Sequence, residues 1–170
     1  DEPIYTNDMV VKMAQAAKWA GAVGIRANTP EQIRLIKENC DLPIIGLYKI
    51  WHEDTDVFIT PTLEACREVW EAGADIIALD CTSQLTHEKT KAWDLLPIVK
   101  REIPEAIIFA DVANYAEARR AIDNGADIVA PTLYGYTEET KHIEGANMRE
   151  FARMCRDFKD EAYVLMEGHI

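Results

Sequence analysis

The stretch that decides the fold is residues 71–80, EAGADIIALD. It contains the end of a helix, a glycine that turns the chain, and a short apolar strand that ends in a charged residue. Glycine is favoured at this turn because helices commonly end in a left-handed conformation that glycine adopts without strain. The same junction recurs as WAGA at residues 19–22 and as DNGADIV at residues 123–129. This repeated unit predicts parallel strands joined by right-handed crossovers, with the helices outside the sheet.

Single charged residues end five of the short apolar runs. The carboxyl end of a buried parallel strand is where the active sites of α/β barrels are built. We therefore expect these five side chains to converge at one end of the sheet, although they are scattered along the chain. They are Arg26, Lys49, Asp80, Asp111 and Glu167.

The spacing of apolar residues predicts six strands, near residues 22, 44, 75, 106, 126 and 162. Between them, apolar residues recur with a period near 3.6, which is typical of amphipathic helices. The expected helices cover residues 7–20, 30–39, 62–72, 88–103, 115–124 and 148–158. A closed TIM (β/α)8 barrel needs eight strands. We therefore expect an α/β fold in which residues 1–170 form a single, partial β/α-barrel domain.

The composition narrows the class of partner. A formal net charge of -12 argues against a nucleic-acid surface or an anionic membrane surface, since both require clustered Lys and Arg. An anionic ligand must then be held locally by backbone N–H groups and one or two cations. The four cysteines form no CxxC pair, and no apolar run is long enough to span a bilayer. A reduced cytoplasmic protein is the simplest interpretation, and Cys81, directly after a strand, is the least improbable nucleophile among the cysteines.

Two loops allow more than one interpretation. Residues 52–56, HEDTD, suggest a metal site, but no second cluster completes a ligand shell, so a solvated acidic loop is favoured. Residues 132–137, TLYGYT, follow a strand and precede a long polar stretch. They form either a lid over the substrate or an ordinary surface loop, and we favour the lid.

Several phrases, taken together and in order, resemble the N-acetylmannosamine-6-phosphate 2-epimerase family of bacterial sialic-acid catabolism, which are TIM barrels. The resemblance runs through nearly the whole chain and implies that the first strand and the eighth βα unit of the barrel are absent here. The chain departs from the family pattern at three places: Thr86-His87, Pro131 and His169. The matching phrases are MAQAA at 13–17, GAVGIRAN at 21–28, PIIGLYK at 43–49, VFITPT at 57–62, DIIALDCT at 75–82, FAD at 109–111, TLYGYT at 132–137 and EG at 167–168.

The resemblance implies that the chain interconverts N-acetylmannosamine 6-phosphate and N-acetylglucosamine 6-phosphate by proton transfer at C2, without a cofactor or a metal. It assigns the proton transfer to Lys49, with Glu167 as a second catalytic residue that orients a sugar hydroxyl or relays a proton. A lysine accepts protons near neutral pH only when burial or nearby cations favour its neutral form, and Arg26 is placed to supply such a field. Expected substrate-binding residues are Arg26, Asp80, Asp111, Tyr136 and Thr137, and expected phosphate-binding residues are Gly168 and His169.

Structural roles compete with these assignments. Lys49 would otherwise pair with Asp80 across the barrel mouth, Arg26 and Glu167 would be members of buried ion pairs, and Asp80 would cap the loop that follows it. Two other functions also compete: a metal-dependent pentose-phosphate 3-epimerase on the same fold, and a non-catalytic phosphosugar-binding protein. A partial barrel exposes two sheet edges, which makes a homodimer plausible.

Overall fold

A computed structural model describes residues 6–168. Helices and strands alternate along this part of the chain, as the repeated junctions predict. The helices are α1 (Asn7–Trp19), α2 (Pro30–Asn39), α3 (Leu63–Glu71), α4 (Leu95–Glu102), α5 (Tyr115–Asp123) and α6 (Met148–Asp157), and a 3-10 turn, η1 (Ala92–Asp94), precedes α4. The strands are β1 (Ile25–Asn28), β2 (Ile44–Leu47), β3 (Ile76–Asp80), β4 (Ile107–Asp111), β5 (Ile128–Ala130) and β6 (Tyr163–Val164).

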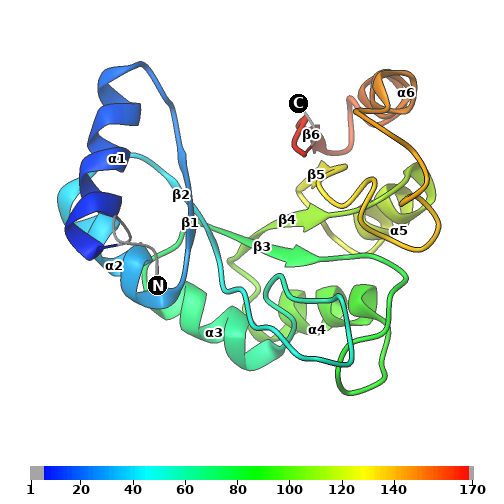
Figure 1. The fold of residues 1–170 in the computed structure, drawn as a ribbon, viewed down its shortest axis with the longest axis horizontal. Coiled ribbons are helices and arrows are strands. Elements are labelled where there is room, and N and C mark those ends of the chain that lie inside the picture. Colours follow the sequence, from blue (N-terminus) through cyan, green and yellow to red (C-terminus); the bar gives the residue numbers. More distant parts are fainter. Residues whose placement is uncertain (1–5, 169–170) are drawn as a thin grey trace.

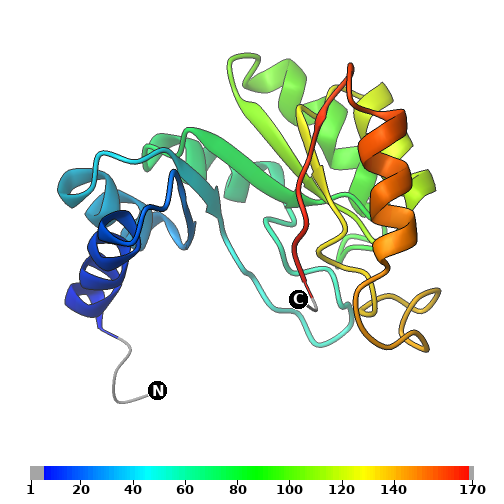
Figure 2. The ribbon, with the colours of Figure 1, turned by 90° about the horizontal axis from the view of Figure 1, so that it is seen from above.

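All six strands are parallel and pair in chain order from β1 to β6. The sheet is curved, and the helices lie around its outer side (Figures 1 and 2). The sheet does not close on itself within residues 6–168, where β1 and β6 each pair on one side only. The expected α/β architecture with a partial barrel is therefore confirmed, and the identity of the units that complete the barrel stays a prediction.

Apolar side chains pack on both faces of the sheet. Between the strands and the helices lies the larger cluster, which includes Ile36 of α2, Val69 of α3 and Phe158 after α6. A smaller cluster fills the inside of the curve and includes Leu47 and Phe109. Burial on both faces explains why the strands are nearly continuous apolar runs.

The glycine junctions adopt the expected conformation. Gly73 and Gly125 have φ values of 96° and 98°, and each directly follows the C-cap residue of its helix. The amide of Gly73 donates to Trp70 O, and the next residue, Ala74, donates to Val69 O. These paired bonds end α3 and lead the chain into β3, as a glycine-terminated helix predicts.

One predicted helix is wrong at its start. The sequence pattern places a helix over residues 88–103, but α4 begins only at Leu95. Residues before it form a turn in which the Thr86 amide donates to Thr90 O and Lys89 has a φ of 63°. This turn satisfies the backbone locally, so the helix cannot extend toward the amino end. Within residues 6–168, no helix has the length and apolar character needed to span a membrane.

Candidate active site

An open cleft lies at the carboxyl ends of the strands. Its volume is about 550 Å³, which is within the usual range for small-molecule sites. Arg26 from β1, Lys49 after β2, and Glu167 and Gly168 after β6 all line it. The convergence expected for these strand ends is therefore present in the structure, although the residues come from opposite ends of the chain.

Arg26 is the central cation of the cleft. Its Nη2 lies 2.8 Å from Oδ2 of Asp111, and its Nε lies 3.2 Å from Oε1 of Glu167. The guanidinium also lies 4.8 Å from the centroid of the Phe109 ring, a stacked arrangement that suits arginine. Nη1 is buried and makes no hydrogen bond within residues 6–168. Arg26 is thus an ion-pair member with one buried nitrogen that makes no hydrogen bond in the described part of the chain.

Asp111 lies beneath Arg26 and is fully buried. Burial raises the pKa of its carboxyl, while the charge of Arg26 and the hydroxyl of Thr132 act in the opposite direction. Oδ1 of Asp111 and Oγ1 of Thr132 nevertheless make no well-aligned hydrogen bond in the described part of the chain. Buried polar atoms without partners are uncommon, and these lie next to the cation that lines the cleft.

Glu167 is half-buried at the end of β6. Burial raises the pKa of its carboxyl, and the charges of Arg26 and Lys49 oppose that shift. Gly168, which follows, has a φ of 80°, and a Cβ at this position would lie 2.7 Å from the carbonyl oxygen of Thr132. Only glycine fits this turn, which keeps the backbone after Glu167 against the loop that follows β5.

Lys49 lines the cleft but is exposed. Its Nζ lies 5.6 Å from the centroid of the Phe58 ring, and no ion pair with Asp80 forms, because Asp80 lies in the interior. The expected burial of the ammonium is therefore absent, since Lys49 lies at the open side of the cleft. The expected field of Arg26 is also offset, because two carboxylates pair with that guanidinium.

Asp80 takes the capping role that competed with substrate binding. Its Oδ1 accepts hydrogen bonds from the amide and the hydroxyl of Thr82, at 2.8 and 2.7 Å. Its Oδ2 is buried and has no partner within residues 6–168. Burial raises the pKa of Asp80 to about 7, and the nearby carboxylates of Asp111 and Glu117 add to the rise, while Thr82 opposes it. Asp80 does not line the cleft that contains Lys49.

The loop after β5 contains two further predicted substrate-binding residues, and only one of them lines the cleft. Tyr136 is exposed and lines the cleft. Thr137 instead is buried within its own loop, where its Oγ1 lies 2.8 Å from Oγ1 of Thr140. The structure therefore does not bring Thr137 into this cleft, because its hydroxyl stabilises the loop internally. His169 lies outside the described residues.

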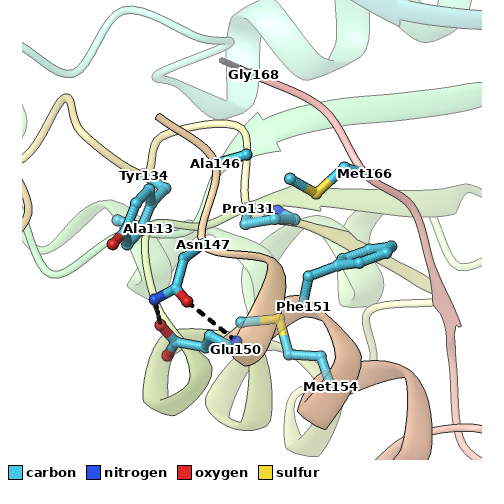
Figure 3. A pocket seen from close by; sticks show the side chains of 10 residues that line it. All are labelled: Ala113, Pro131, Tyr134, Ala146, Asn147, Glu150, Phe151, Met154, Met166 and Gly168. Carbon is cyan, nitrogen blue, oxygen red and sulfur yellow. Dashed lines mark hydrogen bonds between the residues drawn. The ribbon is translucent and has the colours of Figure 1, made fainter. Parts of the chain in front are cut away.

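A small pocket lies between the loop after β5, helix α6 and the segment that follows β6. Met166 faces Phe151 and Met154 of α6, and Pro131 lies between these side chains and the loop (Figure 3). On the polar side of the cavity, the Asn147 side chain caps α6 by accepting from the Glu150 amide at 3.1 Å. These contacts fix α6 beneath the segment that carries Glu167 and Gly168.

Two buried polar residues near the strand ends were missed by sequence reasoning. Glu117 of α5 is buried, and its two carboxylate oxygens accept hydrogen bonds from the amides of Ser83 and Ala113, at 2.7 and 2.9 Å. It thereby joins the loops after β3 and β4. Thr60, which is fully buried with a φ of 46°, lies beside the end of β2. An acidic residue in the first turn of a helix is common, so Glu117 carries no clear signal in the sequence. Thr60 lies in a loop without a regular pattern, so its burial carries none either.

The loops suggested for metal binding and nucleophilic chemistry have other roles. His52 stacks on His87 with ring centroids 4.3 Å apart, and Nδ1 of His87 lies 2.7 Å from Asp54. No group of three or more His, Cys, Asp or Glu residues that could hold a metal ion occurs within residues 6–168. Cys81 is fully buried, and burial raises the pKa of its thiol well above the usual value, which does not favour a thiolate nucleophile.

Comparisons with known proteins identify the family. The family model described as "Putative N-acetylmannosamine-6-phosphate epimerase" matches residues 10–170. The chain belongs to the N-acetylmannosamine-6-phosphate epimerase family. A relative in this family from Listeria monocytogenes serovar 1/2a, named "Putative N-acetylmannosamine-6-phosphate 2-epimerase", is 41% identical over 172 residues, which cover all of this chain and 72% of the relative. Another with the same name, from Borreliella afzelii, is 37% identical over 171 residues, with 100% and 74% covered.

Solved structures agree with the family assignment. The N-acetylmannosamine-6-phosphate 2-epimerase from Clostridium perfringens superposes with a TM-score of 0.88 at 30% identity, covering all of this chain and 72% of that one. The 2-keto-3-deoxy-6-phosphogluconate aldolase of Zymomonas mobilis superposes with a TM-score of 0.64 at 16% identity, covering 98% of this chain and 68% of that one. At that identity the second likeness shows the β/α-barrel fold alone.

Proposed function

We propose that this chain is a cofactor-independent sugar-phosphate epimerase that interconverts N-acetylmannosamine 6-phosphate and N-acetylglucosamine 6-phosphate at C2. Family membership supports the reaction class. The observation that carries the proposal at the level of residues is that Arg26, Lys49 and Glu167 line one cleft. This arrangement brings a flexible amine, a fixed guanidinium and a carboxylate to one small-molecule site.

Proton transfer at C2 is assigned to Lys49. On the open-chain aldehyde form of the sugar, the neutral amine takes the C2 proton and the C–H electron pair moves into an enolate with the C1 carbonyl. A proton is then delivered to the opposite face of C2, the aldehyde re-forms and the ring can close. Because Lys49 is exposed in the unliganded cleft, the substrate itself must displace water from the ammonium before this step. Glu167, which pairs with Arg26, is placed to orient a sugar hydroxyl or to relay the returning proton.

Arg26 supplies the anchoring charge. Two of its nitrogens bind carboxylates, and the third, Nη1, is buried without a partner in the described chain. The rest of the Arg26 side chain is partly exposed at the cleft, so its charge would stabilise an anionic or enolate oxygen bound there. The turn at Gly168 is assigned to the phosphate, because Gly168 lines the cleft and the loops after the last strands of β/α barrels often bind phosphate through backbone N–H groups. The assignment of His169 to the phosphate also stays a prediction.

The ligand, compartment and oligomeric state of the enzyme follow from the same assignment. Its partner is a small phosphorylated amino sugar, and its compartment is the cytoplasm, in keeping with four cysteines that are free. A homodimer also remains part of the proposal, because β1 and β6 present edges within residues 6–168.

Isotope exchange tests the role of Lys49. In deuterated water, the enzyme should incorporate deuterium at C2 of N-acetylmannosamine 6-phosphate, and Lys49→Ala should abolish that incorporation. Lys12→Ala is the matched control, because Lys12 is an exposed lysine of α1 that pairs with Asp8 and lies outside the cleft. Undiminished exchange in a folded Lys49→Ala protein would remove this lysine from the mechanism.

A further inference from the structure

A short segment is inserted between the ends of two neighbouring strands. The pairing of β2 with β3 stops at Gly46 and Ile77, although β3 continues to Asp80. Beyond that point Ile59 and Thr60, both buried, lie between the two strand ends. The amide of Asp80 donates to Ile59 O at 3.0 Å, so the inserted segment replaces β2 as the partner of β3.

The Thr60 side chain makes the connection across this insertion. Its hydroxyl donates to Ala78 O of β3 at 2.6 Å and accepts from the Tyr48 amide at 3.0 Å. The Thr60 amide also donates to Tyr48 O at 2.9 Å. One buried residue therefore satisfies the backbone of the residue just before Lys49 on both its donor and its acceptor.

The backbone of Thr60 is strained. Its φ is 46°, a region that a β-branched residue rarely occupies because of steric clashes. The next residue is Pro61, which further restricts the conformation of the residue before it. Strain of this kind persists where the surrounding structure fixes it, and such residues gather at functional sites.

The lysine itself depends on these contacts for its place. Lys49 forms an antiparallel bridge with Ile59, and its amide donates to Oδ1 of Asn28 at 2.9 Å. The next amide, of Ile50, donates to Phe58 O at 3.0 Å. Since the Lys49 side chain is exposed and has no ion pair among the described residues, its direction is set by this backbone arrangement.

We propose that Thr60 is a positioning residue for the proposed reaction. Its strained backbone, and a hydroxyl that both donates and accepts a hydrogen bond, fix the backbone of Tyr48 against β3. Lys49, the next residue, is thereby directed into the cleft. This inference rests on the proposed function of Lys49. Thr60 itself is fully buried and makes no contact with substrate.

Three substitutions at Thr60 separate orientation from stability. Thr60→Val keeps the shape and loses both hydroxyl bonds, Thr60→Gly removes the strain but also lacks the hydroxyl, and Thr60→Ser keeps the hydroxyl. We expect kcat to fall about 10- to 100-fold in the valine and glycine variants, since misplacing a catalytic group by about 1 Å costs this much. KM should change little, and Thr60→Ser should restore kcat to near the wild-type value.

A neighbouring threonine provides the matched control. Thr62 caps α3 by accepting from the Ala65 amide at 3.1 Å and does not contact the end of β2. Thr62→Val should lower the melting temperature while leaving kcat unchanged. The proposal fails if Thr60→Gly is folded with wild-type kcat, or if kcat follows melting temperature equally in the Thr60 and Thr62 variants.

The two proposals fail in different ways. Wild-type deuterium exchange in Lys49→Ala would contradict the function proposed for the lysine, and with it the positioning role of Thr60. Loss of exchange in Lys49→Ala, together with full kcat in the Thr60 variants that lack the hydroxyl, would contradict the positioning role alone.

Discussion

At the scale of single residues, the carboxyl groups near the strand ends occupy different surroundings. Asp111 has a guanidinium 2.8 Å away, whereas Oδ2 of Asp80 has no partner within residues 6–168. Both are buried. A buried carboxylate without a countercharge is costly, so the neutral form is favoured and the pKa rises. Asp80 is therefore expected to change its charge near neutral pH, at a pKa of about 7.

This difference predicts a pH dependence of stability. Since burial raises the pKa of Asp80 to about 7, the folded protein binds one more proton than the unfolded chain between about pH 4 and pH 7. The contribution of Asp80 is therefore complete below about pH 4 and is lost as the pH rises through about 7. This loss amounts to at most about 4 kcal/mol of the free energy of unfolding between pH 4 and pH 7. Asp80→Asn removes the titrating group, so the decline over this pH range should become smaller by up to that amount.

Urea unfolding at a series of pH values measures that effect. Asp160→Asn, on an exposed turn, is the control and should leave the pH profile unchanged. Identical profiles for the wild type and Asp80→Asn would show that folding does not raise the pKa of this carboxyl.

The sequence predicts the charged residues at the strand ends better than it predicts the buried polar residues around them. The runs that end in Arg26, Lys49 and Glu167 are visible in the sequence, because a charge after an apolar strand is a local pattern. The left-handed conformation of Thr60 and the burial of Glu117 are not, because each depends on a backbone amide that folding brings close, of Tyr48 and of Ser83 respectively. The burial of Thr137 likewise depends on Thr140 within a loop that has no regular pattern.

At the scale of secondary-structure elements, Gly46 of β2 allows the strand and its covering helices to approach closely. A Cβ at this position would lie 2.6 Å from Cβ of Ala74, 2.8 Å from Cγ1 of Val69 and 2.9 Å from Cδ1 of Ile33. Glycine thus lets α2 and α3 pack directly on β2. Because β2 also leads to Lys49, the position of this strand bears on the site.

Adding one methyl group at Gly46 should therefore be costly. Gly46→Ala forces the neighbouring side chains or β2 to move, and we expect the free energy of unfolding to fall by about 1–3 kcal/mol. Gly24→Ala is the comparison, since a Cβ there meets only Pro43 O, at 3.4 Å. Chemical denaturation of both variants checks this, and equal stability of the two would contradict the packing argument.

The elements themselves were largely predictable. Residues 30–39 were expected to be helical from Thr29 and Pro30, and α2 covers Pro30–Asn39 with Thr29 as its cap. The error at residues 88–103 has a different origin, because the turn stabilised by Thr86 and Thr90 is formed by side-chain and backbone bonds that periodicity does not reveal.

At the scale of the whole molecule, Arg26 joins the two ends of the sheet. From β1 it reaches Asp111 at the end of β4 and Glu167 after β6. Figure 1 shows β1 and β6 on opposite sides of the curved sheet. The curvature of the sheet is thus stabilised by a cation at its mouth as well as by the apolar core.

Removing this cation should destabilise the fold in a pH-dependent way. Arg26→Met leaves Asp111 buried without its countercharge, and breaking such a pair costs about 3–5 kcal/mol. Because Arg26 lowers the pKa of Asp111, the substitution raises that pKa further. The loss should then be small near pH 4 and grow as the pH rises, since the folded state must release the proton at a higher pH than the unfolded state.

A double variant tests the assignment of that effect. In the Arg26→Met background, Asp111→Asn should recover most of the stability at pH 8 and remove most of the added pH dependence, as followed by thermal unfolding. An unchanged pH dependence in the double variant would assign it to another group.

The reach of Arg26 along the chain has a consequence for biosynthesis. Arg26 lies on the first strand of the sheet and Asp111 85 positions later, while Glu167 comes later still, after β6. Contacts between such distant positions form slowly, because the chain between them must first be ordered. During translation, the ion pair between Arg26 and Glu167, and with it the complete cleft, can therefore form only after the segment beyond β6 has been synthesised.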